Sequence, residues 1–441
     1  MCMEGSLEEM IKRYIVTSAE YGAGVNHKQL DAYEQYASQW DADIIVVPIE
    51  GQHKDEPMHP RIAQYTNADE MSLNDNLSIE DFGVKAQTIN PLTGLKRFGK
   101  STIVGSPKMH LEHVANSPKI SAHAVMSTGS CTTPNYKQNR IGRIGNRDHQ
   151  QGAILVEVED NKTFHFRQAV HNVDGSFIDM GIKYSAKGPS KDVSIPALVM
   201  ADLHDHQKDI AAYDATLGFL DEYDVKNVVG HDIFDAYSIS HHDAKSAMTL
   251  ARKAKGDELN LRQELYNLGQ TVEEIASRTG TFYAVKSNHD EHLTRWLEEG
   301  RFMQEPHNLE LGLKLASALI EGKDPVEEGI KLTYGSVPSN MKFLQRDDEL
   351  RIKGVECAFH GDKGPRGGRG SPIGLEYSLR DATVAHMHHA FIRKGLWGVG
   401  SLALNQAYTK GSMGCGTITH NLINNNGKRQ HINYTNGKFT V

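Results

Sequence analysis

Five short motifs between residues 202 and 388 contain side chains of the kinds that bind metal ions. In chain order they are Asp202-Leu203-His204, Gly230-His231-Asp232, Ser287-Asn288-His289-Asp290, Phe359-His360-Gly361-Asp362 and Ala385-His386-Met387-His388. Their imidazole nitrogens, carboxylates and amide oxygen suit manganese, iron or zinc better than calcium or magnesium. Two such ions sharing a carboxylate can activate a water and stabilise the attacking and leaving oxygens of a phosphate ester. The motifs therefore predict metal-assisted phosphoester hydrolysis.

Each motif follows a short apolar run that predicts a buried strand: residues 197–200, 225–229, 282–285, 355–359 and 382–384. Strands of an α/β sheet that end at a shared edge bring such ligands together. A single Asp-x-His or His-x-His pair means little, because the chain has 23 histidines. All five motifs in this order are a specific indication of a metal site.

The length of 441 residues predicts two domains, each large enough to bury a core. We place them at residues 1–190 and 191–441, because the segment around Gly188-Pro189 has the composition of a linker. The four cysteines are widely spaced without a CxxC pair, which favours reduced thiols in a cytoplasmic protein.

The charge balance and hydropathy of the chain limit its partners. A formal net charge of -8 gives no general attraction to nucleic acid, so contacts with phosphates must come from local basic patches. No signal peptide and no run long enough to cross a bilayer is visible, so we expect no membrane contact.

The N-terminal region opens with a strand at residues 12–19, a helix at 26–40 and a strand at 44–49, as in parallel α/β folds. Gly22 and Gly24 suggest a dinucleotide fingerprint, but His27 replaces its third glycine, so a plain tight turn is favoured. Two further strands are predicted at 153–159 and 163–168. Between residues 137 and 147 a basic, glycine-punctuated loop either follows a phosphate backbone or is simply solvated; its candidate contacts are Lys137, Arg140 and Arg143.

The order of the five motifs resembles that of the calcineurin-like metallophosphoesterases, over residues from about 196 to 441. A narrower resemblance covers most of the chain. The stretches 126–130, 152–157, 360–372 and 408–412 are similar to those of the pre-early host-DNA-degradation proteins of tailed bacteriophages.

The resemblance implies an α/β fold of calcineurin-like type, a β-sandwich flanked by helices, preceded by a separate N-terminal α/β domain. Position by position, it implies that Asp232 bridges two divalent ions, for which Mn²⁺ is preferred and Fe, Zn or Mg are alternatives. The other implied ligands are Asp202, His204 and His388 for one ion, and Asn288, His360 and His386 for the second. It also implies that His289 faces the leaving oxygen and that Asp290 orients its ring.

The chain departs from the family pattern at His231, Ser287 and Ala385, where glycine is usual. These changes leave the ligands in place provided that the backbone there keeps φ negative. We expect His231 to lie either directly behind the ligands or at the surface.

Two further groups of residues could line the cleft. Arg366 and Arg369 lie in a glycine-rich loop, where they could bind phosphate bidentately or be solvated on a mobile loop. The segment 241–243, with two histidines and an aspartate, either lines the cleft or caps a helix.

The function expected from these features is hydrolysis of DNA by a two-metal-activated hydroxide, in a phage-encoded degradation of host DNA. One alternative is a phosphoesterase acting on a nucleotide or another small molecule. Another is a DNA-binding or DNA-transfer protein that uses its site weakly. The N-terminal domain shows no catalytic constellation, so we expect it to position DNA or to hold a homo-oligomer together.

Overall fold

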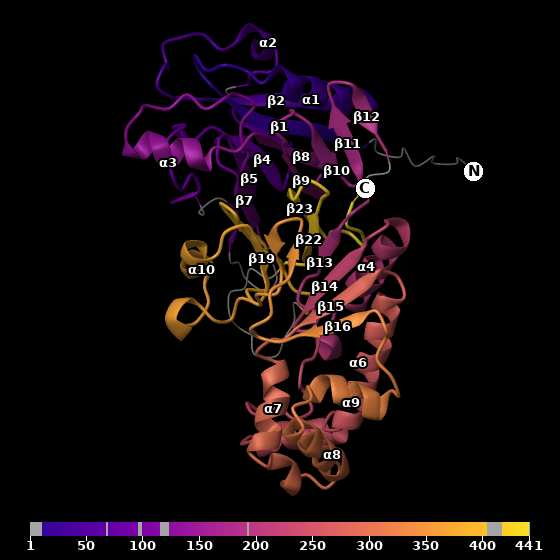
Figure 1. Ribbon diagram of the computed structural model, residues 1–441. Coiled ribbons are helices and arrows are strands. Elements are labelled where there is room, and N and C mark those ends of the chain that lie inside the picture. The colour runs from indigo at the N-terminus through magenta and orange to yellow at the C-terminus, as the bar shows by residue number, and fades with distance from the viewer. Residues whose placement is uncertain are drawn as a thin grey trace, which may run out of the picture.

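The computed structural model describes residues 11–67, 69–95, 99–114, 123–191, 194–403 and 417–440. The stretch 408–412, used above for the phage resemblance, lies outside these ranges. Within them the chain is a mixed α/β protein built around two large sheets, with a smaller N-terminal sheet at one end and a lobe of helices at the other (Figure 1).

The first large sheet contains the strands that precede three of the metal motifs. In the described residues its strands are, in spatial order, β16 (Met341–Leu344), β15 (Thr281–Val285), β14 (Asn227–His231), β13 (Ala197–Val199), β22 (Thr419–Ile423) and β23 (Arg429–Asn433). The pairings from β13 to β16 are parallel, whereas β22 and β23 are antiparallel to their neighbours. Three of the five apolar runs thus form buried parallel strands whose carboxyl ends share one edge, as predicted. The expectation is corrected for the other two, 355–359 and 382–384, whose strands β18 (Val355–Glu356) and β19 (Ala382–Val384) belong to the second large sheet.

The second large sheet joins strands from both halves of the chain. Its strands among the described residues are, in spatial order, β17 (Arg351–Ile352), β18 (Val355–Glu356), β19 (Ala382–Val384), β21 (Leu396–Gly398), β20 (Phe391–Arg393), β6 (His110–Val114), β7 (His123–Ser127), β5 (Ser101–Val104), β4 (Leu77–Glu80) and β3 (Met71–Asn74). The two halves meet where Ile392 of β20 pairs with Leu111 of β6. The expectation of a separate N-terminal domain is therefore corrected: strands on both sides of residue 190 share one ladder of backbone hydrogen bonds.

The two large sheets pack face to face, and helices cover the other face of the first. Val199, Val229 and Val285 of the first sheet share a buried apolar cluster with Val355 of the second sheet and with Val399, which directly follows β21. The covering helices and those of the lobe, which share a second core, are α4 (Ile210–Glu222), α6 (Leu261–Ala276), α7 (Asp290–Glu298), α8 (Leu309–Ile320) and α9 (Pro325–Thr333). Three shorter elements lie in the connections: the 3-10 turn η1 (Asp205–Gln207) before α4, the helix α5 (Ala247–Lys255) before α6, and the 3-10 turn η2 (Arg301–Gln304) before α8.

The N-terminal sheet begins with the predicted strand, helix and strand: β1 (Lys12–Glu20), α1 (His27–Trp40) and β2 (Ala42–Ile49). The predicted strand pair is also confirmed, as β8 (Gly152–Val158) and β9 (Phe164–Val170), and the sheet order is β2-β1-β8-β9. Gly22 makes a tight turn with φ 67°, a backbone conformation that favours glycine. A side chain at this position would also collide with His53 and Glu56. A small sheet follows, with β10 (Phe177–Asp179), β11 (Ile182–Ser185) and β12 (Gly188–Ser190).

Short helices complete the described chain: α2 (Pro60–Ala63), α3 (Arg140–Asp148), η3 (Pro365–Gly367) and α10 (Pro372–Ser378). The basic segment expected to be a loop is helical from Arg140 onward, since the Asn139 side chain accepts a hydrogen bond from the Gly142 N–H and caps α3. No helix in the described ranges is long and apolar enough to cross a membrane.

Candidate metal centre

The predicted ligands lie in turns at the ends of strands β13, β14, β15, β18 and β19. Four of these residues have left-handed backbones: φ is 45° at His204, 43° at Asp232, 70° at His386 and 56° at His388. Such strain in non-glycine residues persists where the surrounding structure requires it, and functional sites are a common place. The three departures from the family pattern, His231, Ser287 and Ala385, are not among the positive-φ residues, so the condition set for them holds.

One ligand group consists of Asp202, His204, Asp232 and His388. Each offers one donor atom, and these atoms lie within 4.8 Å of one another. The Nε2 atoms of His204 and His388 are 3.1 Å apart, and the Oδ2 of Asp232 is 3.6 Å from the His204 Nε2. Four nitrogen and oxygen donors this close match the four-coordinate shell of a transition metal.

The second group consists of Asp232, His360 and His386, whose donor atoms also lie within 4.8 Å of one another. The His360 Nε2 is 3.3 Å from the Asp232 Oδ2 and 3.0 Å from the Asn288 Oδ1. The structure thus brings all seven predicted ligands together, with Asp232 common to both groups.

The buried carboxylates test whether these residues fit metal ions. Both oxygens of Asp232 and the Oδ1 of Asp202 are buried without a hydrogen-bond partner among the described residues. The Oδ2 of Asp202 accepts the His386 N–H at 2.9 Å. Because an unpaired buried carboxylate is costly, a pair of cations between these groups would supply the missing partners. The donor set fits two divalent ions.

The protonation of the centre shows how strongly its charges interact. Burial raises the pKa of Asp202 to about 7, and the neighbouring Asp232 acts in the same direction. Burial works against the charged form of His204, but its hydrogen bond to Asp235 and the nearby Asp232 raise its pKa to about 9. Burial and repulsion from His204 lower the pKa of His388 to about 3. A bound cation would displace protons held by these groups.

His289 lies beside the first ligand group, with its ring centroid 4.8 Å from that of His204. Its side chain is 16% exposed, so it faces the open side of the site. The Nδ1 is 3.2 Å from the carbonyl oxygen of Asp235 and 3.5 Å from its carboxylate. His289 could therefore present its Nε2 to a substrate.

The expectation that Asp290 orients the His289 ring is corrected. The Asp290 carboxylate instead accepts the Ser287 N–H at 2.8 Å, which fixes the turn before α7. Asp235 instead lies against the Nδ1 of His289, so it takes the position that orients this ring. Its carboxylate also lies 3.1 Å from the Nδ1 of His204. Sequence reasoning missed Asp235, although it follows Asp232 by three residues in the same turn.

His231 lies behind the second ligand group. It is fully buried, and its ring stacks on that of His360 with centroids 5.6 Å apart. Of the two expected positions, behind the ligands or at the surface, the structure shows the first.

The Arg366–Arg369 loop lies next to the metal centre. Both arginines are exposed, and the loop is closed by hydrogen bonds from the Gly364 N–H to Gly368 and from the Gly370 N–H to Asp362. Asp362 is held in turn by Arg346 at 2.7 Å. The positive charge of Arg369 is close enough to contribute to the lowered pKa of His386, which burial dominates.

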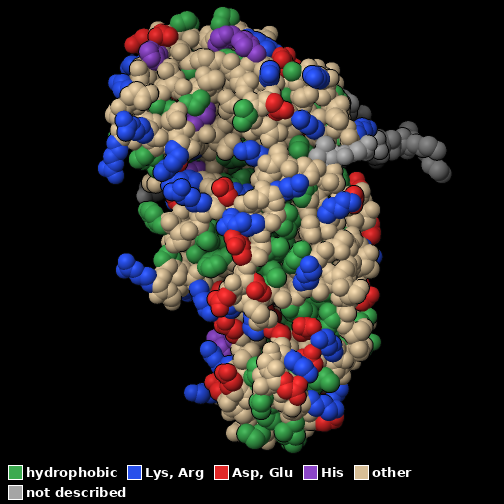
Figure 2. Space-filling model, viewed as in Figure 1, with side chains coloured by type: hydrophobic (Ala, Val, Ile, Leu, Met, Phe, Trp, Pro, Cys, Tyr) green, Lys and Arg blue, Asp and Glu red, His purple; other side chains and the backbone are tan. Residues whose placement is uncertain are grey.

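The other predicted substrate contacts, Lys137, Arg140 and Arg143, are exposed on and before α3 in the N-terminal half. Figure 1 places α3 away from the strand ends of the first sheet, on the same side of the molecule as α10. Figure 2 shows Lys and Arg side chains gathered around α3 on this face. They are therefore remote from the metal centre.

Comparison with known proteins shows similarity to a bacteriophage protein. No family model matches the chain. The chain is 27% identical to "Protein A1" of Escherichia phage T5, and the alignment covers 97% of this chain and 83% of the phage protein. The similarity to a bacteriophage protein thus extends over both halves and is not restricted to the metal motifs.

Proposed function

We propose that the protein is a metal-dependent deoxyribonuclease of the calcineurin-like metallophosphoesterase type. The observation that carries the proposal is Asp232, a fully buried carboxylate whose unpaired oxygens lie between two groups of nitrogen and oxygen ligands. This arrangement suits two divalent ions a few ångströms apart, with Mn²⁺ preferred from the donor set.

The chain's own residues would divide the chemistry as follows. When bound, the two ions would supply Lewis acidity that activates water and neutralises the charge of a phosphodiester. His289, on the open side of the site, would donate a proton from Nε2 to the leaving oxygen. The Asp235 carbonyl oxygen accepts from the Nδ1 of His289 and so holds the ring with its Nε2 toward the substrate. The Asp235 carboxylate, 3.5 Å from the same Nδ1, would stabilise the imidazolium, which carries the Nε2 proton that is transferred.

Several features support DNA as the substrate. Arg366 and Arg369 are exposed in the loop that follows the ligand His360, and Arg369 is close enough to affect the pKa of the ligand His386. Guanidinium groups placed there could bind phosphates flanking the reacting one. The exposed basic side chains of α3 could contact a more distant part of a long duplex. The likeness to a bacteriophage protein over nearly the whole chain, taken with the resemblance to the pre-early host-DNA-degradation proteins, supports a role in degrading host DNA within the infected cell. We further propose a homo-oligomer, which light scattering would test.

The test compares cleavage of three substrates by the purified full chain: plasmid DNA, a chromogenic phosphodiester and a chromogenic phosphomonoester. Each is incubated with Mn²⁺, Fe²⁺, Zn²⁺ or Mg²⁺, beside an Asp232→Asn control. We expect metal-dependent cleavage of plasmid that the control lacks. Preference for the monoester would instead indicate a small-molecule phosphoesterase, and a mobility shift of DNA without cleavage would indicate a DNA-binding protein.

A further inference from the structure

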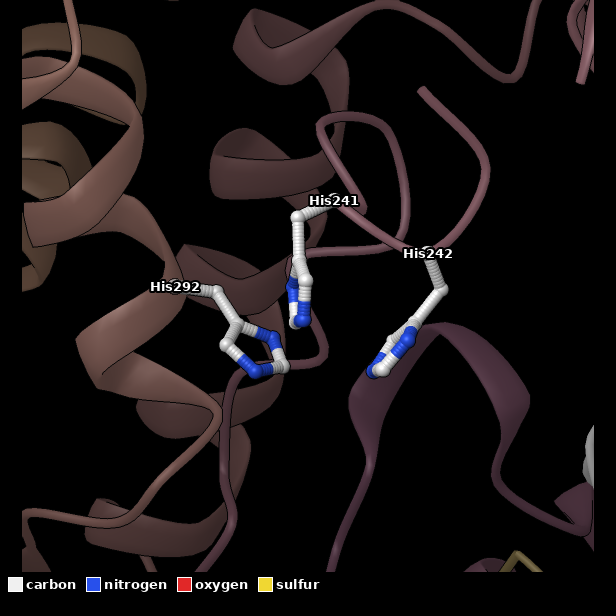
Figure 3. A group of neighbouring side chains, drawn as sticks. All are labelled: His241, His242 and His292. Atoms are coloured by element: carbon white, nitrogen blue, oxygen red, sulfur yellow. The ribbon is translucent and has the colours of Figure 1, made fainter. Parts of the chain in front are cut away.

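Three histidines outside the two-metal ligand groups point their rings toward one another. His241 and His242 lie in the segment that follows β14, and His292 lies in the first turns of α7 (Figure 3). Each offers a ring nitrogen, and the three nitrogens lie within 4.8 Å of one another. The ring centroids are 3.8 Å apart for His241 and His242, and 4.6 Å apart for His241 and His292.

The segment that carries two of these histidines is held at both sides by polar contacts. Before it, the Arg301 guanidinium donates to the Ile239 carbonyl at 2.8 Å. After it, the buried Lys253 ammonium lies 2.6 Å from the Asp243 carboxylate and also donates to the Tyr237 carbonyl at 2.6 Å. The imidazoles are therefore positioned before any ligand arrives, which lowers the ordering cost of binding.

Two of the three imidazoles, those of His241 and His292, are in the form that binds metals. Burial and the adjacent His242 lower the pKa of His241, and burial and His289 lower the pKa of His292 to about 3. Both rings are thus neutral at pH 7, and each keeps a lone pair for a cation. The Nδ1 of His241 is buried and has no hydrogen-bond partner in the described part of the chain. A cation among the three rings would supply that partner.

We propose that His241, His242 and His292 form a third metal site, which binds one Zn²⁺-class cation through three imidazole nitrogens. Nitrogens bound at about 2.0–2.1 Å to a tetrahedral ion are roughly 3.4 Å apart, so rings already within reach of one another need only small rotations. Three protein ligands leave a fourth position for water or for an oxygen of a bound anion.

The position of this site connects two of the metal motifs. The His292 ring centroid is 5.1 Å from that of His289, so the third ion would place positive charge beside the proposed proton donor. It would also link α7, which begins just after Asn288, to the segment that begins with Asp232 and contains Asp235. The site would thereby hold together two turns that supply ligands and the orienting carboxylate. This inference goes beyond the proposed activity, because it concerns a separate ion.

The test measures metal content and not turnover, so its outcome is independent of the nuclease proposal. In the full-length Asp232→Asn protein, where metal binding at the two-metal centre should be weakened, Co²⁺ is titrated as a spectroscopic substitute for zinc. We expect one Co²⁺ per chain with the intense visible absorption of a tetrahedral site. Zinc should displace it with equal stoichiometry.

Substitutions then assign this ion to the three histidines. In the Asp232→Asn background, His292→Ala and the double change His241→Ala with His242→Ala should each abolish the absorption. His242→Ala alone changes an exposed side chain, so it should keep the fold and weaken Co²⁺ binding at least tenfold. His307→Ala, another exposed histidine of the same half, is the matched control and should leave binding unchanged. No tetrahedral Co²⁺ signal before substitution, or a signal that survives in His292→Ala and in the double variant, would overturn the proposal.

Discussion

The carboxylate of Asp232 contacts ligands of both groups, so its charge would act on both proposed cations at once. Replacing Asp232 by Asn should weaken both ions, because it removes the negative charge they share. His289→Ala should leave the content of these two ions nearly unchanged and slow turnover by about a hundredfold or more, because it removes the proposed proton donor and not one of the proposed ligands. Metal analysis beside kinetics separates the two effects. A loss of metal from His289→Ala in proportion to its lost activity would make His289 a ligand.

Asp235 contacts the imidazoles of both His204 and His289. Asp235→Asn should therefore lower metal affinity by about 10–100-fold, as is common when a carboxylate behind a ligating histidine is changed, and slow turnover as well. Asp290→Asn is the matched comparison, because an amide oxygen can still accept the Ser287 N–H. Metal titrations and single-turnover rates on both variants distinguish the carboxylates. A larger loss in Asp290→Asn than in Asp235→Asn would return the orienting role to Asp290.

His420 supports the backbone just before Asp202, and it is buried as a neutral ring. Its Nδ1 accepts the Ala201 N–H at 2.9 Å, and its Nε2 lies 2.9 Å from the Thr216 hydroxyl. Burial lowers its pKa to about 3. The folded state therefore binds this proton less readily than the unfolded chain, whose histidine has a pKa of about 6.5. The stability from His420 is complete above pH 6.5 and is lost as the pH falls toward 3.

The change His420→Gln tests this linkage, because glutamine can accept and donate the same two bonds without taking up a proton. Between about pH 6 and pH 4 one such histidine contributes about 1.4 kcal/mol per pH unit to the slope of unfolding free energy. We expect the variant to flatten the slope by about that amount in urea titrations across this range. Equal slopes for the two proteins would show that His420 is protonated in the folded state.

At the scale of elements, the proposed function assigns the loop between Gly361 and Gly370 to holding DNA at the candidate metal centre. Arg366→Ala with Arg369→Ala should weaken DNA binding and reduce the slope of log affinity against log salt by about one unit for each lost contact. Cleavage of a small phosphodiester should survive. Arg252→Ala, an exposed arginine of α5, is the control. A salt slope unchanged from that of the control would assign the loop a structural role.

The elements that carry the ligands could be predicted from the sequence, because short stretches of residues specify each strand and the turn that follows it. Apolar runs such as 197–200 and 282–285 form buried strands, and a turn follows each with its polar residues. The shared position of Asp232 was implied by the resemblance to the calcineurin-like metallophosphoesterases. Asp235 could not be chosen in this way, since its role depends on which ring its carboxylate reaches after the turn has formed.

The helix α3 was missed because its glycines at 142 and 145 weaken helix propensity, whereas the Asn139 cap and the packing of Gly145 on Tyr136 stabilise it.

At the scale of the whole molecule, the pairing of distant strands could not be predicted, because a strand's own sequence does not specify its neighbour. Ile392 and Leu111 are both buried and belong to one apolar cluster with Trp397 and Met126. On the other side of the molecule, the Gln430 side chain donates to the Gln168 carbonyl, and the His431 N–H donates to the Gln168 side chain. The regions before and after residue 190 are thus joined by a sheet, an apolar core and buried hydrogen bonds.

A chain that begins near Ser190 should consequently fail to fold. Removing the first half would expose the edge of β20, the apolar face around Ile392 and the buried polar groups of β23, and such surfaces promote aggregation. We expect this fragment to be insoluble or to lack cooperative unfolding by circular dichroism, and to bind no metal.

In the full chain, Leu111→Ala should lower the free energy of unfolding by about 2–5 kcal/mol and destabilise both halves together, whereas the exposed Ile141→Ala should change it little. Limited proteolysis with detection of fragments from each half would show whether they unfold as one. A soluble, monodisperse fragment with a cooperative transition would instead establish two domains divided near residue 190.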